Sequence, residues 1–556
     1  MGSNAAESTT ATATTTSYAE RNAAWLLAGL IVLAAVLRLP MLDRPVWFDE
    51  ACMSSQRIGT VPQLLATLYK DIHPPLFVAF MHLWNGWFGD GEVMLRMPAL
   101  LTGLFCIPLT WWTGQRLVGH TASMWAAALL ALSPVHVWYC TEARLYTPMV
   151  MCTLLAFGTF DRLLADDERP RPWLWLLHLG NVAVMLALHY YLAVVVAALA
   201  GLAPVLARGF TGRARAILVT HGIGIVLLAG FLYVKQTLGQ FETSQGYLRA
   251  LTVPGLCDFL FGWAWTGNTL QSDPSPLLRG LGQSHYWLGV SLAVLGVIHI
   301  ALHRRDRPRG VLVPFGLLLL PCFLLGCAWV GYGQTYLERT LIPALPFLLL
   351  LAGAGITFVP GRLADVVGGL ATGLATLSVL ALLTSFDSRW TVYKPHPDWR
   401  AAARYLGREI DTGNAGTPVF TSMPNPRSLS YYDPRIQDKK NLRVDVSPEQ
   451  IGAKVGRFLG ERMAKLARET FAEFAAHNRR LLADAKLIVR RSRPNPADLD
   501  LPDARPDGIV YLVRNQWHPH PSVDDSIERL LQHPDVETLH TERLQGVTVY
   551  KVRIHP

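Results

Sequence analysis

Two adjacent carboxylates follow an apolar segment that is long enough to cross a membrane. This segment, Ala23 to Leu42, is almost uncharged and about 20 residues long, which suffices to span a ~30 Å hydrocarbon core. The chain continues with Trp-Phe-Asp-Glu, so Asp49 and Glu50 are predicted to lie just outside the bilayer. An isolated acidic pair can also simply mark a solvated loop, so the pair alone does not decide between the two interpretations.

Further ionisable groups occur before the next apolar segment and at its start. His73 stands in Asp-Ile-His-Pro-Pro-Leu, and Arg96 lies at the mouth of the next apolar run. Carboxylates, an imidazole and a guanidinium at one membrane surface suggest chemistry on a lipid phosphate. Two interpretations stay open for each residue. His73 is either a metal or phosphate ligand or the residue that holds the Pro-Pro turn, and Arg96 either binds phosphate or is an interfacial arginine with its tip in water.

The composition is that of a polytopic membrane protein. Of 556 residues, 51% are hydrophobic and 16% are charged, whereas about a quarter of the residues in soluble proteins are charged. The net charge of +9 comes largely from arginines in short turns, as the positive-inside rule requires of cytoplasmic loops, and it does not indicate nucleic-acid binding. The seven cysteines have no zinc-like spacing, but Cys52 and Cys257 lie in predicted external segments and could pair.

About eleven transmembrane helices can be threaded with the N-terminus in the cytoplasm and most loop arginines inside. The predicted spans are roughly 23–42, 93–115, 120–140, 147–165, 172–188, 190–207, 214–236, 285–302, 311–331, 340–358 and 363–385. Residues 76–88 are apolar but too short to cross the bilayer, and we predict that they form a helix in the membrane interface. This helix belongs to a first external loop at 43–92.

The chain divides into three parts by composition. Residues 1–22, rich in Ser, Thr and Ala, are predicted to be a disordered cytoplasmic tail. Residues 23–385 form the transmembrane part. Residues 386–556 are charged, have no long apolar run and are predicted to fold as a soluble extracytoplasmic α/β domain. Its predicted helices are 398–410 and 448–483, and its predicted strands are 418–422, 509–514 and 547–554.

The threading brings more polar residues from later loops to the same outer face. They are Glu142, Arg144, Tyr146, His189, Tyr190, Tyr191, Tyr336, Glu338 and Arg339. Ionisable groups at membrane depth are costly and are usually kept for function. The tyrosines have a second interpretation, because aromatic belts are common at this depth.

The ordered set of motifs resembles a known family. The motifs are Asp-Glu, Asp-Ile-His-Pro-Pro-Leu, Leu-Arg-Met-Pro-Ala-Leu-Leu-Thr-Gly, Glu-Ala-Arg-Leu-Tyr, His-Tyr-Tyr and Glu-Arg-Thr-Leu-Ile-Pro-Ala-Leu-Pro. Together they are similar to the GT-C membrane glycosyltransferases of the protein O-mannosyltransferase and lipid A aminoarabinose transferase type. The resemblance covers about residues 23–385, and it implies a GT-C catalytic domain in the bacterial inner membrane with the C-terminal domain in the periplasm.

The resemblance implies an inverting transferase that moves one monosaccharide from a polyprenyl-phosphate-linked donor to an extracytoplasmic acceptor, which could be a lipid, a glycan or a protein hydroxyl. Asp49 is then the general base that deprotonates the acceptor hydroxyl. Glu50 orients Asp49 or helps to hold a divalent ion, Mg²⁺ or Mn²⁺, and Asp49, Glu50 and His73 are the candidate metal ligands. Metal dependence stays open, as do the identities of the sugar and the acceptor.

The other site residues have roles that the resemblance implies for the donor. Arg96 is expected to bind the donor phosphate, and Arg144 and Arg339 are further candidates for the same group. Tyr146, Tyr190 and His189 complete the predicted substrate-binding set.

Two other classes of function are compatible with charged groups at membrane depth. One is a transporter or flippase of lipid-linked glycans, although inverted repeats and discontinuous helices, which are frequent in transporters, are not evident in the sequence. The other is a non-catalytic scaffold of envelope glycan synthesis, which would not need the carboxylate pair.

Overall fold

The computed structural model describes most of the membrane part and the core of the C-terminal part. The described residues are 22–54, 73–165, 172–237, 250–266, 276–303, 308–331, 336–384, 397–414, 418–421, 427–438, 487–490, 509–515, 527–528, 530–534 and 536–554. The predicted tail, the predicted helix at 448–483 and Asp71 lie outside these ranges, apart from Asn22.

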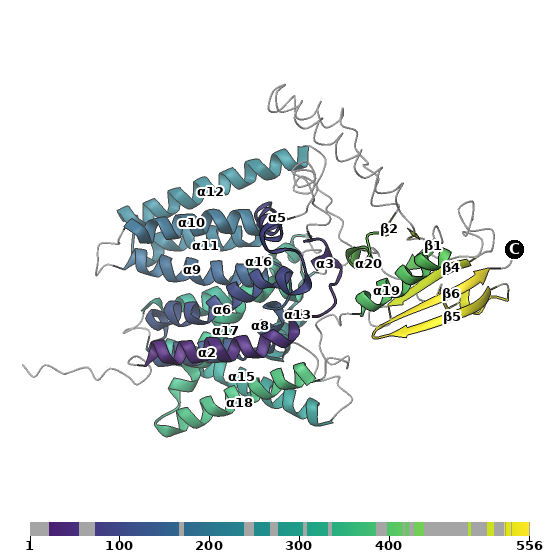
Figure 1. The fold of residues 1–556 in the computed structure, drawn as a ribbon. Coiled ribbons are helices and arrows are strands. Elements are labelled where there is room, and N and C mark those ends of the chain that lie inside the picture. The colour runs from purple at the N-terminus through teal and green to yellow at the C-terminus, as the bar shows by residue number, and fades with distance from the viewer. Residues whose placement is uncertain are drawn as a thin grey trace, which may run out of the picture.

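A helix stands at each of the eleven predicted spans, and together these helices form a bundle (Figure 1). The helices are α2 (Ala23–Arg38), α6 (Glu92–Leu117), α7 (His120–Ala131), α9 (Tyr146–Leu164), α10 (Pro172–Leu188), α11 (Tyr190–Leu206), α12 (Gly212–Thr237), α15 (Pro276–Leu302), α16 (Leu312–Trp329), α17 (Leu345–Phe358) and α18 (Arg362–Thr384). In the described part of the chain, seven helical segments are long and apolar enough to cross a membrane. The protein is therefore a polytopic α-helical membrane protein, while α7, α9, α10 and α11 are not among those seven.

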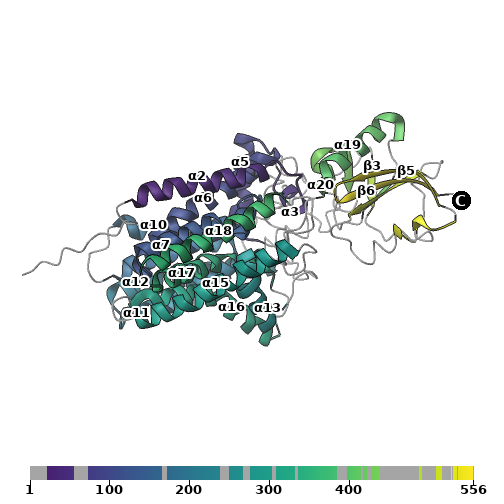
Figure 2. The same ribbon diagram turned by 90° about the horizontal axis from the view of Figure 1, so that it is seen from below.

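Short elements gather at one end of the bundle. They are η1 (Leu39–Met41), α3 (Phe48–Ala51), α5 (Leu76–Phe88), α8 (Pro134–Tyr139), α13 (Val253–Asp258), η3 (Phe259–Trp263), α14 (Ala264–Thr266) and η6 (Glu338–Ala344), whereas η5 (Pro308–Val311) precedes α16. Figures 1 and 2 show α3 and α13 at the end that faces the C-terminal sheet. Helix α5 has the bounds that were predicted for the helix at 76–88. Pro75 precedes its first residue, and a proline there prevents the helix from beginning earlier, because it has no N–H group and its ring clashes with a preceding helical turn.

The C-terminal part is built on one mixed sheet, which confirms its α/β class. The elements are α19 (Trp399–Glu409), η7 (Ile410–Asn414), β1 (Pro418–Thr421), α20 (Arg427–Tyr432), β2 (Ile436–Asp438), β3 (Leu487–Arg490), β4 (Ile509–Asn515), β5 (Val536–Leu544) and β6 (Val547–Ile554). The strand order is β2-β3-β1-β4-β6-β5. The first four strands of this order run parallel, and β6 pairs antiparallel with both β4 and β5. We call residues 397–554 the sheet unit.

Two glycines let α15 and α17 cross with their backbones in contact. A Cβ atom on Gly355 of α17 would collide with the Leu292 carbonyl oxygen of α15, and one on Gly296 of α15 would collide with the Leu351 carbonyl oxygen of α17. Helices in a bilayer associate through such small residues, because apolar lipid gives no hydrophobic driving force between them. Since α17 continues directly from η6, this crossing also fixes the position of the residues at the start of η6.

We expect Gly355→Leu to destabilise the bundle by about 1–3 kcal/mol, because the added side chain would force the two backbones apart. The matched control is Gly373→Leu in α18, where an added Cβ meets no atom within 4 Å. Thermal unfolding of the two purified variants in the same detergent measures the difference. Equal midpoints for both variants would contradict the close crossing of α15 and α17.

Candidate functional site

A buried ion pair holds the short helix that carries the two predicted catalytic carboxylates. Arg96 Nε donates to Glu50 Oε1 at 2.8 Å, and Arg96 Nη2 donates to Glu50 Oε2 at 2.5 Å. Both side chains are completely buried. Such a two-point arginine–carboxylate contact fixes orientation as well as distance, so Glu50 locks α3 against α6.

The same pair also holds the chain between α2 and α3. Arg96 Nη1 donates to the carbonyl oxygens of Leu42 and Arg44 at 2.6 and 2.7 Å, and Nη2 donates to that of Pro45 at 3.3 Å. With the two bonds to Glu50, all five N–H groups of the guanidinium are used. On the other side, Glu50 Oε1 accepts a bond from the backbone N–H of Ala143 at 3.0 Å.

These contacts change the roles that the sequence suggested for Arg96 and Glu50. The guanidinium of Arg96 is fully buried and its donors are saturated, so it has no N–H group left for a donor phosphate, and its tip does not reach water as an interfacial arginine would. Glu50 is equally committed and does not fit a metal ligand. In the described part of the chain, no group of three or more His, Cys, Asp or Glu side chains could hold a metal ion, and the residues present do not match the predicted Mg²⁺ or Mn²⁺ site.

Asp49, the neighbour of Glu50, lies next to an arginine that comes much later in the sequence. Arg339 Nη2, at the start of η6, is 3.8 Å from Asp49 Oδ2, and the two side chains remain 16% and 18% exposed. The guanidinium carbons of Arg339 and Arg144 lie 5.9 and 6.0 Å from the ring centre of Tyr146. The structure therefore brings together Asp49, Arg144, Tyr146 and Arg339.

Two histidines extend this cluster on the side of Arg144. The rings of His73 and His189 are 5.7 Å apart. Burial, and then the nearby charges of His73 and Arg144, hold the pKa of His189 well below its ordinary value, so its imidazole is neutral. Its Nδ1 accepts a bond from the backbone N–H of Tyr191 at 3.1 Å, which leaves the proton on Nε2 as a donor. Tyr190 follows directly as the first residue of α11 and is half-buried.

An aromatic wall that the sequence analysis did not single out stands beside Tyr146. The ring of Tyr139, at the end of α8, lies edge-on to Tyr146 with ring centres 4.9 Å apart. Trp263 of η3 follows at 6.1 Å from Tyr139 and stacks on Phe259 at 5.4 Å. All four rings are buried, and the Phe-Leu-Phe-Gly-Trp run within a predicted external loop was the sequence signal for this aromatic packing.

Glu142, in the turn after α8, bonds to a tryptophan. Its Oε1 accepts a bond from Trp138 Nε1 at 2.7 Å. Burial raises the pKa of Glu142, and the nearby Glu50 adds to this shift. Arg44 lies with its guanidinium carbon 4.3 Å from the centre of the Trp138 ring and donates to Thr141. These residues pack beneath the cluster and stabilise the turn that carries Arg144.

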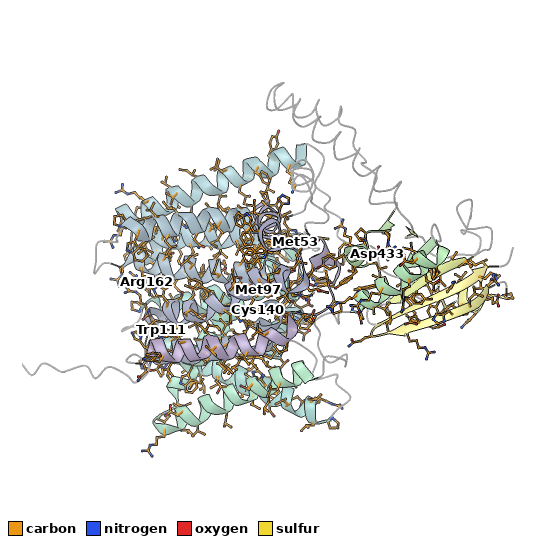
Figure 3. All side chains as sticks on the ribbon, viewed as in Figure 1. Met53, Met97, Trp111, Cys140, Arg162 and Asp433 are labelled. Carbon is orange, nitrogen blue, oxygen red and sulfur yellow. The ribbon has the colours of Figure 1, made fainter. Side chains whose placement is uncertain are left out.

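The sheet unit contacts α3 directly, a contact that no sequence motif indicated. The Tyr432 hydroxyl of α20 accepts a bond from the backbone N–H of Val46 at 2.6 Å and donates to Glu92 at 2.9 Å. The guanidinium carbon of Arg427 lies 5.2 Å from the centre of the Phe48 ring. Figures 1 and 2 show α20 beside α3, and Figure 3 places Met53, just after α3, toward Asp433, while Arg162 lies at the far end of the bundle. Cys52 and Cys257 are free thiols in this structure.

The chain is similar to one protein family and to several solved structures. Residues 72–234 match the family model for dolichyl-phosphate-mannose-protein mannosyltransferases. The crystal structure of ArnT from Cupriavidus metallidurans in the apo state aligns with a TM-score of 0.55 and 10% identity over 96% of this chain and 98% of that one. A search of curated protein sequences finds no significant match.

Two further alignments have lower scores. ArnT from the same organism bound to undecaprenyl phosphate gives a TM-score of 0.48 and 13% identity over 95% of this chain and 97% of that one. The Archaeoglobus fulgidus oligosaccharyltransferase complex with Zn and sulfate gives 0.44 and 11% over 88% and 68%. The first alignment, with a score above 0.5, is the one that supports a shared fold. The chain has the fold of ArnT from Cupriavidus metallidurans, to which it is similar over nearly its whole length.

We expect Arg96→Met to destabilise the protein by about 3–5 kcal/mol, because it leaves the carboxylate of Glu50 buried and unpaired. The matched control is Arg553→Met, which removes an arginine from an exposed pair with Glu537 at 3.2 Å and should cost less than about 1 kcal/mol. Thermal unfolding in detergent measures both. If Arg96→Met unfolds like the wild type and loses only donor binding, the arginine is a phosphate ligand after all.

Proposed function

We propose that the protein is an inverting glycosyltransferase that moves a monosaccharide from a polyprenyl-phosphate-linked donor to an acceptor hydroxyl outside the cytoplasm. The observation that carries the proposal is the pairing of a partly exposed carboxylate, Asp49, with a partly exposed arginine, Arg339, across 3.8 Å. The family model that matches residues 72–234 is described by a donor of this type, dolichyl-phosphate-mannose. The acceptor is a lipid, a glycan or a protein hydroxyl.

In the proposed reaction, Asp49 removes the proton from the acceptor hydroxyl while its oxygen attacks the anomeric carbon of the sugar. The new bond forms on the face opposite to the phosphate, so the configuration at this carbon is inverted. The bond to the phosphate oxygen breaks, and its electron pair stays on the polyprenyl phosphate. The products are the glycoside, the lipid phosphate and a protonated Asp49, which then releases its proton to water.

The two arginines of the cluster are assigned to the leaving phosphate. Arg339 and Arg144 flank Tyr146 at similar distances, and positioned cations stabilise charge that develops in the transition state. Neutral His189 adds an N–H donor that does not depend on its own charge. Because the N–H groups of Arg96 all bond to Glu50 and to backbone carbonyl oxygens, we assign the phosphate-binding role predicted for Arg96 to Arg339 and Arg144 instead.

The aromatic side chains are assigned to the support of the site. The rings of Tyr146, Tyr139 and Trp263 form a continuous row beside Arg339. They are 5%, 6% and 5% exposed, so they belong to the packed core beneath the site. The row therefore supports a rigid position for Arg339 next to Asp49.

We propose that this site faces the outside of the bacterial inner membrane. At the opposite end of the bundle, Arg116 and Arg309 both pair with Asp161, at 2.7 and 3.1 Å, and Arg162 lies over the Trp112 ring at 3.6 Å. A concentration of arginines is typical of the cytoplasmic end.

The proposed orientation can be tested by cysteine labelling in intact cells, in a background where the native cysteines that are not buried, at positions 52, 257, 322 and 327, are replaced by Ser. An impermeant reagent should label a cysteine at Glu537, which is exposed in β5, and it should not label one at Phe210, which is 66% exposed in the turn between α11 and α12. The Phe210 variant should react only after the membrane is opened. The reverse pattern would overturn the orientation.

We expect Asp49→Asn to abolish transfer while folding and donor binding persist, because the amide has nearly the same shape but cannot accept the proton. The loss should be at least the roughly 10²–10⁴-fold that is typical of removing a general base. Transfer from a polyprenyl-phosphate sugar, followed by mass spectrometry of the product, is the measurement. Wild-type turnover by the mutant would remove Asp49 from the mechanism, and absence of transfer by the wild type would favour a transporter or a scaffold.

We expect Arg339→Ala to reduce the rate constant of transfer by about 10²–10³-fold, the scale for one transition-state donor. Arg339→Lys should restore part of this loss, because lysine keeps the charge but lacks the planar fork. The control is Arg543→Gln, an exposed arginine of β5, which should leave the rate unchanged. If Arg339→Ala raises only the Michaelis constant of the donor, the arginine binds the donor without stabilising the transition state.

A further inference from the structure

Helix α20 of the sheet unit contacts α3 and its flanking residues at three points. The Tyr432 hydroxyl accepts a bond from the backbone N–H of Val46 at 2.6 Å. The guanidinium carbon of Arg427 lies 5.2 Å from the centre of the Phe48 ring. Arg427 Nη1 also donates to Cys52 Sγ at 2.5 Å. These contacts extend from the chain just before α3 to the residue that follows it.

The contact with Val46 satisfies a backbone group that water does not reach. Val46 is completely buried, and a buried N–H group that loses its partner destabilises the segment that carries it. The same Tyr432 hydroxyl donates to Glu92, at the start of α6, at 2.9 Å. The Tyr432 ring packs against the core of the membrane part and also against the core of the sheet unit, so the position of its hydroxyl is fixed from both parts.

Asp49 stands between two residues that are held by different parts of the protein. Phe48, the residue before it, meets Arg427 of the sheet unit. Glu50, the residue after it, is bonded to Arg96 of the bundle. Helix α3 has only four residues, and a helix this short is not stable by itself. The direction in which Asp49 points therefore depends on both sets of contacts.

We propose that α20 positions the general base: by holding residues 46–52, it keeps the Asp49 carboxylate 3.8 Å from the guanidinium of Arg339. This inference rests on the proposed role of Asp49 in proton transfer. A displacement of about 1 Å at a reacting group can reduce a rate about 10²-fold, so contacts that do not touch the substrate affect kcat. Tyr432 and Arg427 are then positioning residues, and the sheet unit contributes to turnover without supplying a reacting group.

Tyr432→Phe tests this inference, because it removes the hydroxyl and leaves the ring in place. We expect kcat of transfer to fall about tenfold, while KM for the donor keeps its wild-type value because the residues assigned to the donor are unchanged. The matched control is Tyr431→Phe. The Tyr431 hydroxyl also donates at 2.6 Å to a backbone group of the membrane part, but this group is the Asp90 carbonyl, between α5 and α6. The control should keep the wild-type kcat.

Hydrogen–deuterium exchange of the full-length protein in detergent measures how firmly α3 is held, without any substrate. The backbone N–H groups of residues 51–53 bond to the carbonyl oxygens of residues 47, 48 and 50, so their exchange reports the opening of α3. These groups should exchange about tenfold faster in Tyr432→Phe than in the wild type, the scale of one lost hydrogen bond. In Tyr431→Phe they should exchange at the wild-type rate.

Arg427 provides a second pair of variants that leaves Tyr432 intact. Arg427→Met should also accelerate exchange at residues 51–53 and lower kcat, because it removes the cation beside the Phe48 ring. Arg427→Lys should restore part of both quantities, since lysine keeps a cation on a flexible stem. A loss of general stability would change the two Arg427 variants and Tyr431→Phe alike, whereas the positioning of α3 separates them.

The inference is overturned if residues 51–53 exchange in Tyr432→Phe as they do in the wild type, or if Tyr431→Phe accelerates them equally. It is also overturned if α3 opens faster in Tyr432→Phe and kcat does not change. Failure of the proposed function gives a different result. If the wild type transfers no sugar while Tyr432→Phe still accelerates exchange, the proposed reaction is wrong and the holding of α3 by α20 stands.

Discussion

The end of the bundle that carries the candidate site depends on one buried ion pair, between Glu50 and Arg96. Burying two charges costs several kcal/mol for each ion, and the cost is offset only where the geometry is good and the remaining donors are satisfied. Here the guanidinium meets that condition, with two bonds to the carboxylate and three to backbone carbonyl oxygens. Helix α3 has only four residues, too few to be stable by itself, so this pair gives the helix its position.

The pair also explains why two adjacent carboxylates have different roles. Consecutive residues of a helix point in different directions, so when Glu50 faces the interior, Asp49 faces outward toward Arg339. Glu50 then holds the local backbone, and Asp49 carries out the proton transfer in the proposed reaction. Two carboxylates can have different roles in one site when their surroundings differ.

The sheet unit is joined to the same helix through polar contacts. Tyr432 bonds to Val46 immediately before α3. Glu92, at the start of α6, accepts from Tyr432 and pairs with Arg400. These side chains therefore join the sheet unit to the start of α6 and to the segment that leads into α3.

The sequence by itself predicted a helix at each of the eleven apolar segments, the bounds of the helix at 76–88 and the α/β class of the C-terminal part, because hydropathy and helix length are local properties. It also predicted that Asp49, Arg144 and Arg339 lie on one face, and these residues lie close together in the structure. Only the tertiary structure decided which arginine pairs with which carboxylate: Arg96 with Glu50, and Arg339 with Asp49. Arg96 and Arg339 look alike in sequence, both near the start of a helix, but Arg96 is enclosed by α3 and backbone carbonyls and Arg339 stays partly exposed. The contact of Tyr432 with Val46 joins residues 386 positions apart, and no local pattern records such a contact, since it exists only once the sheet unit docks on the bundle.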